Sequence, residues 1–289
     1  MEPFSLIVLL VMGTLAGAIN AAVGSGSLLT LPVLMAVGIP PGVAVRTNTV
    51  GMLFSTIGSV VGYRKEIAEE KRDLPPLVIT AASGAILGAL LLLVSPASAL
   101  DVVVPVLIVV ALAMVVFQKR ITAALRAWSD RRKAARAQTA RRKDAPAGSD
   151  AATGSDISAG VEVPERSPLR SPALVSTMGA ASVYGGYFTA AQGILYLGIL
   201  GTFTGRSMGS VNSVKNLLSL VVNLAAAAIY VIAHFVIGAE IVWLATAAIA
   251  VGALIGGYFG AHLAKLMPEW LLRGVIVVVA LIALVRQFI

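Results

Sequence analysis

Cysteine is absent from this 289-residue chain, only 12% of its residues are charged, and histidine occurs just twice. Without thiols there are no disulfides, and zinc or iron–sulfur centres that require thiolate ligands are excluded. No nucleophile–histidine–acid set, metal-ligand spacing or phosphate-binding loop is present either. We therefore expect no enzyme activity, no catalytic residues, no metal and no other cofactor.

Acidic residues are missing from the centres of the apolar segments. All 14 lie in hydrophilic loops or near segment ends. Proton relays in membrane pumps usually contain a buried carboxylate or histidine. His234 and His262 both lie near segment ends, where packing roles are expected. Coupling to protons through a carboxylate is therefore not expected. Any ion coupling would use backbone carbonyls, Asn and Ser oxygens, or simply the charge of the substrate itself.

Apolar residues, in contrast, make up 58% of the chain, and the mean hydropathy is +0.91. Long apolar runs are typical of a polytopic helical membrane protein. We predict an all-α membrane protein with about eight transmembrane helices, two of which are interrupted by glycine-rich stretches. The predicted spans cover approximately residues 4–37, 43–63, 75–94, 101–117, 172–203, 208–235, 240–266 and 268–289.

A hydrophilic segment separates these spans into two groups of four. Residues 119–171 begin as a stretch rich in Arg, Lys and Ala and continue with low hydrophobicity. We interpret them as a basic helix that extends the fourth span, followed by a disordered linker. Residues 1–118 and 172–289 then form two transmembrane repeats. The basic stretch is expected to be solvated or to contact anionic membrane lipids. Nucleic acid is not an expected partner, because no nucleic-acid-binding fold surrounds the charges.

Basic residues near the span ends predict the orientation of the chain. They follow the second and fourth spans, which places both loops, including the central linker, in the cytoplasm. Both termini are then inside if each interrupted segment crosses once, whereas re-entrant interruptions place the N-terminus outside. An even number of spans in each repeat favours parallel rather than inverted symmetry.

A polar face interrupts the sixth predicted span. Asn212, Asn216, Ser219 and Asn223 follow the helical offsets 0, 4, 7 and 11, with Lys215 beside them. A lysine within a membrane span costs about 2.5–3.5 kcal/mol on insertion scales, so it requires a partner or a function. The Asn and Ser residues could simply bridge helices. For Lys215, extension to the interface is the alternative to binding a substrate anion, which we favour.

A related face occurs in the second span. Aligning Asn48 with Asn212 places Ser55 and Ser59 on Ser219 and Asn223, and this match suggests a duplicated unit whose two striped helices face each other. Glycine-rich interruptions in both halves point to a transport site with free backbone N–H groups, although bent, closely packed helices are an alternative. The candidate substrate site comprises Asn48, Asn212, Lys215, Asn216, Ser219, Gly24, Gly26, Gln192 and Gly193.

Several stretches resemble the TauE/SafE sulfite-exporter family, also called the toluene-sulfonate uptake permeases. They cover both apolar halves and read GAINAAVGSGSLLTLPVLMAVG, AVRTNTV with GYRKEI, SVYGGYFTAAQGILYLGILG, VNSVKNLLSLVVNLAAAAIYVI and ALIGGYFGAHLAKLMP. The resemblance implies a multi-pass permease of the bacterial inner membrane that moves small anions, such as sulfite, sulfonates or other organosulfur compounds.

Two motifs depart from the family pattern. The usual run of three glycines is replaced by the sequence from Gly24 to Ser27, and Thr189 and Ala191 replace two glycines of the motif GYFGAGxGI. The added side chains could narrow the site or supply a hydroxyl donor. Alternatives to a carrier are a passive anion channel and a non-transporting assembly or sensor protein. The sequence is also compatible with a homo-oligomer.

Overall fold

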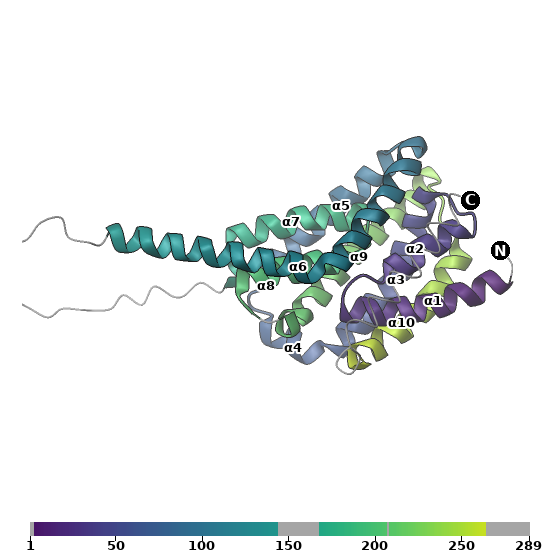
Figure 1. Ribbon diagram of the computed structural model, residues 1–289. Helices are drawn as coiled ribbons and strands as arrows, with labels where there is room; N and C mark the ends of the chain where they lie inside the picture. The colour runs from purple at the N-terminus through teal and green to yellow at the C-terminus, as the bar shows by residue number, and fades with distance from the viewer. Residues whose placement is uncertain (1–2, 144–167, 207, 264–289) are drawn as a thin grey trace, which may run out of the picture.

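The computed structural model describes residues 3–143, 168–206 and 208–263, and every element of regular structure in these ranges is helical (Figure 1). The elements are α1 (Pro3–Ala22), α2 (Ser27–Ala36), α3 (Pro41–Gly62), α4 (Arg64–Glu70), α5 (Pro75–Val94), α6 (Ala97–Lys143), the short 3-10 turn η1 (Pro168–Arg170), α7 (Pro172–Tyr187), α8 (Gln192–Thr204), α9 (Met208–Ile237) and α10 (Trp243–Leu263).

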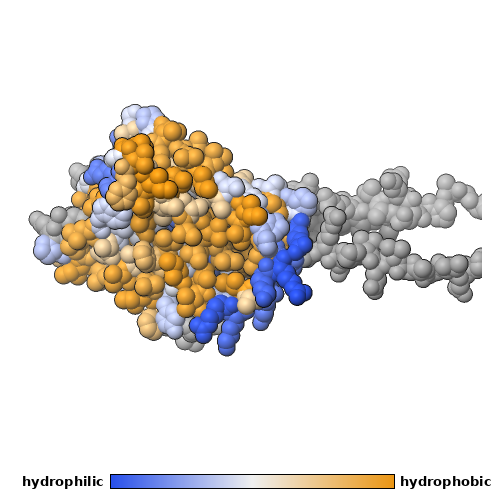
Figure 2. All heavy atoms as spheres, turned by 180° about the vertical axis from the view of Figure 1, so that it is seen from behind, coloured by the Kyte–Doolittle hydropathy of each residue, from blue (hydrophilic) through white to orange (hydrophobic). Residues whose placement is uncertain are grey.

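Five helices in the described ranges are long and apolar enough to cross a membrane: α1, α5, α9, α10 and the first part of α6, Ala97–Phe117. Large apolar side chains face outward on them; Ile79, Val94 and Phe235 are each at least two-thirds exposed. Figure 2 shows a broad apolar surface, with hydrophilic residues gathered toward the end where α6 projects. The chain is therefore a multi-pass membrane protein. The predicted eighth span, 268–289, lies outside the described residues.

Proline and glycine mark several helix boundaries. Proline occupies the first position of α3, α5 and α7, where its missing N–H is not required and its fixed φ suits a helix. α8 ends at Gly205, which has a left-handed φ of 68° and donates its N–H to the Gly201 carbonyl. α6, in contrast, runs without interruption from the predicted fourth span through the basic stretch to Lys143.

α3 and α9, which carry the two polar faces, pack against each other in opposite directions. Near the start of α3, Arg46 Nε donates to the Glu240 carbonyl, 3.0 Å away and just beyond the end of α9. Near the end of α3, the Tyr63 hydroxyl accepts a 2.9 Å hydrogen bond from Asn212, at the start of α9. The parallel symmetry expected from an even number of spans is therefore wrong for these helices.

The reason for the opposite directions is that the interrupted segments turn back. α1 and α3 both run parallel to α10, because the contacts advance together along each pair. Gly13 lies against Ile249 and Gly17 against Ala253, and likewise Gly51 lies against Ile249 and Gly58 against Leu254. α2 then folds back along α1: a Cβ placed on Gly26 would lie 2.1 Å from the Ala16 carbonyl oxygen. The α1–α2 hairpin thus enters and leaves at one end of the molecule. Of the described helices in the first half, α3, α5 and α6 then lead in turn from one end to the other, so the second half starts at the opposite end.

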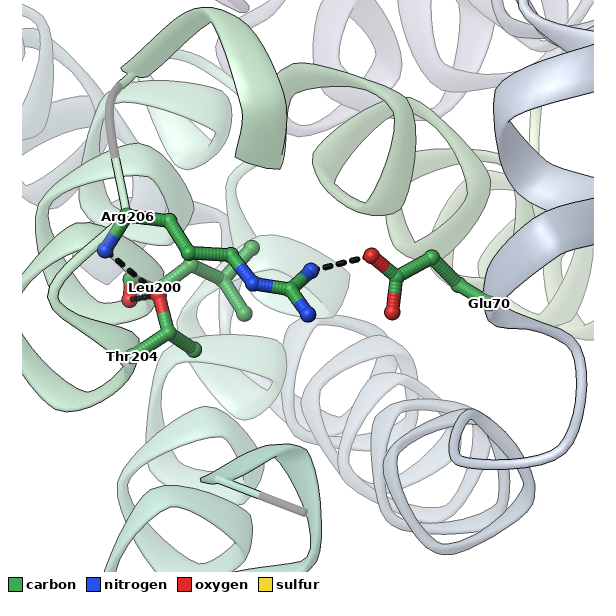
Figure 3. Close-up of polar contacts among 4 residues, drawn as sticks. All are labelled: Glu70, Leu200, Thr204 and Arg206. Atoms are coloured by element: carbon green, nitrogen blue, oxygen red, sulfur yellow. Dashed lines mark hydrogen bonds and ion pairs between the residues drawn. The ribbon is translucent and has the colours of Figure 1, made fainter.

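The second hairpin, α7–α8, starts and finishes at the opposite end. Ion pairs join both of its ends to the loop that carries α4: Arg170 pairs with Asp73, and Arg206 pairs with Glu70. Figure 3 shows the Arg206 guanidinium pointing at the Glu70 carboxylate, beside Thr204, whose hydroxyl accepts the Arg206 backbone N–H. Each hairpin packs on a helix of the other half, α1 along α10 and α7 along α5.

We expect the Arg206–Glu70 pair to contribute little stability. Both side chains are partly exposed, at 35% and 20%, and ion pairs of this kind are worth about 1 kcal/mol or less. Glu70→Gln should therefore lower the free energy of unfolding by no more than about 1 kcal/mol, as measured by denaturation in detergent. The exposed neighbour Glu69 provides the control, and Glu69→Gln should change nothing. A loss several times larger at Glu70 would contradict this expectation.

Candidate functional site at the two helix breaks

The breaks within the two hairpins meet inside the protein through their backbones. Gly193 N donates a 3.0 Å hydrogen bond to the Gly24 carbonyl, and a Cβ placed on either glycine would lie 2.4 Å from the Cα of the other. Gly24 also has a left-handed φ of 80°. Both the contact and the dihedral angle require glycine. The Gly193 N–H, predicted to be available to a substrate, is engaged in this conformation.

Lys215 lies fully buried at the end of α1. Its Nζ donates to the carbonyls of Asn20, at 3.0 Å, and of Ala21, at 3.2 Å. The last carbonyls of a helix have no partner within the helix and carry the negative end of its dipole, so they suit a cation. Lys215 is therefore enclosed by protein and does not reach the molecular surface. Its charge has a partner that the sequence did not reveal.

Asn212 and Asn216 point at the same helix end. Each donates through Nδ2 to the Ala21 carbonyl, at 3.4 and 3.2 Å, and Asn212 also donates to Tyr63. The Oδ1 atoms of both amides are buried without a hydrogen-bond partner. The unpaired amide atoms in this conformation are thus acceptors, rather than the donors predicted for an anion. The Nδ2 donors of both amides are already hydrogen-bonded to the Ala21 carbonyl, which the break in α1 leaves without a partner within the helix.

Asn48 belongs to the other break. Its Nδ2 donates to the Thr189 hydroxyl at 3.5 Å, and its Oδ1 accepts the hydroxyl of Thr30. Asn48 therefore connects the second-half break with α2, whereas Ser55, farther along the same face of α3, contacts α1 through the Gly17 carbonyl and Asn20. The amides of α9 contact the first-half break. Thr189, predicted to narrow the site or supply a donor, accepts a hydrogen bond from Asn48.

The remaining predicted residues have different surroundings. Gly26 is packed against α1 and allows the hairpin to close. Ser219 is buried about one turn beyond Lys215, and its carbonyl accepts Asn223 Nδ2 at 2.8 Å. Gln192 begins α8, and its Nε2 is buried without a hydrogen-bond partner.

Ser25 is a further candidate, which the sequence prediction did not include among the site residues. Its hydroxyl is buried and lacks a hydrogen-bond partner. Ser25 and Gln192 directly adjoin Gly24 and Gly193 in sequence, so two unpaired donor groups flank the contact between the breaks. The signal in the sequence was the departure from three consecutive glycines, which places a hydroxyl where the family usually has none.

Other charged groups do not join this cluster. Arg206 pairs with Glu70, and Arg46 is held by the Glu240 carbonyl. Across the described ranges, no group of three or more His, Cys, Asp or Glu residues is placed to hold a metal ion. The site thus consists of Lys215, neutral amides and hydroxyls, and the backbone of two broken helices, a set that can bind small polar species but contains no nucleophile–base pair.

Comparison with known proteins places the chain in a family. The chain matches the family described as sulfite exporter TauE/SafE over residues 9–286. It is 23% identical to the probable membrane transporter protein YfcA of Escherichia coli K12, over 96% of this chain and 88% of that protein. It is 31% identical to the probable membrane transporter protein ORF9 of a Sinorhizobium species, over 35% of this chain and only 39% of that protein.

The match to the family spans both hairpins and both striped helices. A probable membrane transporter protein of Haemophilus influenzae is 31% identical over 30% of this chain and 34% of its own length. No solved structure gives a significant match. With a family match over nearly its whole length and several spanning helices, the chain is a membrane transporter that belongs to the TauE/SafE family.

Proposed function

We propose that this protein is an inner-membrane carrier of small anions of the class of sulfite, sulfonates and other organosulfur oxyanions. The observation that carries the proposal is Lys215, a fully buried cation where a broken helix ends, hydrogen-bonded to backbone carbonyls. Carbonyl dipoles hold an ammonium group without neutralising its charge. A net positive charge in a protein interior attracts an anion strongly, because little water screens it.

The unpaired atoms suit an oxyanion better than a halide. The Lys215 ammonium has three N–H groups, and two of them are directed at carbonyls. Together with Ser25 and Gln192 it would supply donors to the charged oxygens of a substrate. The unpaired Oδ1 atoms of Asn212 and Asn216 would accept the proton of an oxyanion such as hydrogen sulfite, which chloride does not offer. One charge with neutral amides also binds loosely enough to permit release.

The arrangement of the helices supports a carrier that alternates between two conformations. We propose eight segments in two four-segment repeats related by inverted symmetry, with the eighth segment within residues 268–289. The substrate would bind where the two breaks meet. Contacts hold the described helices together at both ends of the molecule. At one end Arg206 pairs with Glu70, and at the other end Arg46 donates to the Glu240 carbonyl. Movement of one hairpin against the other would open one end at a time.

Flux measurements test this function. The purified protein in proteoliposomes should take up radiolabelled sulfite with saturable kinetics, and unlabelled sulfonates should compete whereas chloride should not. A flux that stays linear in sulfite concentration would indicate a channel instead of a carrier. Absence of flux for sulfite, sulfonates and carboxylates with folded protein would refute transport of this class and favour an assembly or sensor role.

Cysteine labelling tests the proposed orientation, and the chain contains no native thiol to interfere. Ser149→Cys, in the central linker, should react with a membrane-impermeant maleimide only from the cytoplasmic side. Ser98→Cys, exposed at the start of α6, should react only from the opposite side. The expectation follows from the basic residues that flank the second and fourth spans. Labelling of both variants from one side, or each from the side opposite to that expected, would contradict the orientation.

A further inference from the structure

The ammonium group of Lys215 occupies a place where a free cation could bind. α1 ends at Ala22 inside the protein, and the carbonyls of Asn20 and Ala21 are directed at Lys215 Nζ. The C-terminal ends of interrupted helices and unwound backbone carbonyls coordinate the coupling cation in many secondary transporters. Here a side chain of the protein fills that place.

The oxygen atoms around this position suit a monovalent metal ion. Besides the two carbonyls, the Oδ1 atoms of Asn212 and Asn216 are buried and unpaired. Both amides are anchored through Nδ2 to the Ala21 carbonyl, and neither Oδ1 is hydrogen-bonded to Lys215 Nζ, so the amides would have to rotate to bring these oxygens onto a cation at that position. Hard cations prefer oxygen ligands of this kind. All four oxygens are neutral, which favours a single positive charge over a divalent ion.

We propose that Lys215 is a tethered cation that fills a latent alkali-cation site at the end of α1, so that the transporter moves its anion without a coupling cation. The claim that Lys215 fills a cation site depends only on the contacts of Lys215. The claim about coupling depends also on the proposed function, anion transport. A charge that is covalently attached cannot dissociate on either side of the membrane, so no cation gradient can drive the cycle through this site.

Lys215→Ala should convert the latent site into a functional one. Thermal unfolding is measured for wild type and variant in chloride salts of sodium, potassium and N-methylglucamine at equal ionic strength. Wild type should unfold at the same temperature in all three salts. The variant should unfold at a lower temperature in N-methylglucamine, and sodium or potassium should raise this temperature saturably, by roughly 5–10 °C. Propylammonium, which matches the atoms removed, should do the same.

Two further variants make the test specific. Lys71→Ala removes an exposed lysine from the loop after α4 and should show no dependence on the cation. Lys215→Ser places a hydroxyl oxygen at the position and should respond to the metal ions as Lys215→Ala does. A salt-independent unfolding temperature for both Lys215 variants would overturn the proposal, and so would failure of both to fold in every salt, including propylammonium.

Uptake by wild type tests the consequence for coupling. Initial rates of sulfite uptake into proteoliposomes should be equal when external sodium is replaced by potassium or N-methylglucamine. A several-fold fall in rate without sodium would overturn the claim that no cation is coupled. If wild type moves no anion while Lys215→Ala still binds sodium or potassium, the proposed function fails and the latent cation site stands.

Discussion

Lys215→Met is expected to weaken sulfite binding by roughly 2–5 kcal/mol, the range for removing one partner of a desolvated charge pair. Methionine fills about the same space, but it leaves the carbonyls of Asn20 and Ala21 without their donor and removes the charge that attracts the anion. Because the side chain is fully buried, water cannot replace it easily. The measurement is the affinity for sulfite, by titration calorimetry on purified protein and by the concentration dependence of uptake.

The control for this variant is Ser171→Ala. Ser171 precedes α7 at the edge of the linker, and its side chain makes no capping hydrogen bond, so its removal should leave affinity and uptake unchanged. Elution as a single species shows that Lys215→Met is folded. Wild-type affinity in a folded Lys215→Met protein would show that the anion binds elsewhere, and Lys215 would then be a residue that only closes the end of α1.

The second large effect is expected for Gly24→Ala. At a φ of 80° a side chain costs about 1–2 kcal/mol, and its Cβ would lie 2.4 Å from the Cα of Gly193. Backbone cannot move aside as a side-chain tip can, so a further 1–3 kcal/mol of overpacking is expected, and the free energy of unfolding should fall by about 2–5 kcal/mol. Thermal denaturation in detergent measures the loss.

Ala191→Gly is the matched variant at the other break. Ala191 has a left-handed φ of 59°, so glycine relieves strain there while it adds freedom to the unfolded chain. The two effects oppose each other, and stability should stay within about 1 kcal/mol of wild type. Equal stabilities for Gly24→Ala and Ala191→Gly would show that the breaks do not touch as described.

The sequence was informative about which residues turn inward and less so about which atoms they offer. Helical spacing places Asn212, Asn216 and Ser219 on one face, and all three are buried in the structure. Helical spacing does not predict whether the nitrogen or the oxygen of an Asn side chain forms a hydrogen bond. Because Asn212 and Asn216 donate to a carbonyl of a distant helix, the roles of their nitrogen and oxygen depend on where α1 breaks.

The same limit applies to the fold. Hydropathy indicated the helical class, and five of the described helices are long and apolar enough to span a membrane. It could not reveal that both glycine-rich segments fold back, because a bent crossing and a hairpin have the same composition. The tight contact between Gly26 and Ala16 decides between them, and it joins residues whose proximity depends on the backbone path. The number of crossings, and with it the relative direction of α3 and α9, followed from that turn.

The packing of each hairpin on the other half has a consequence for synthesis. α1 ends at Ala22, whereas its partner α10 starts only at Trp243. At 5–20 residues per second, the ribosome needs roughly 10–50 s to make the chain between them. During this interval the glycines of α1 that will contact Ile249 and Ala253 face lipid or the insertion machinery. The first half is therefore inserted in the bilayer before its packing partner has been made. We expect the late assembly of the two halves, more than the insertion of single helices, to be the step most exposed to quality-control proteolysis.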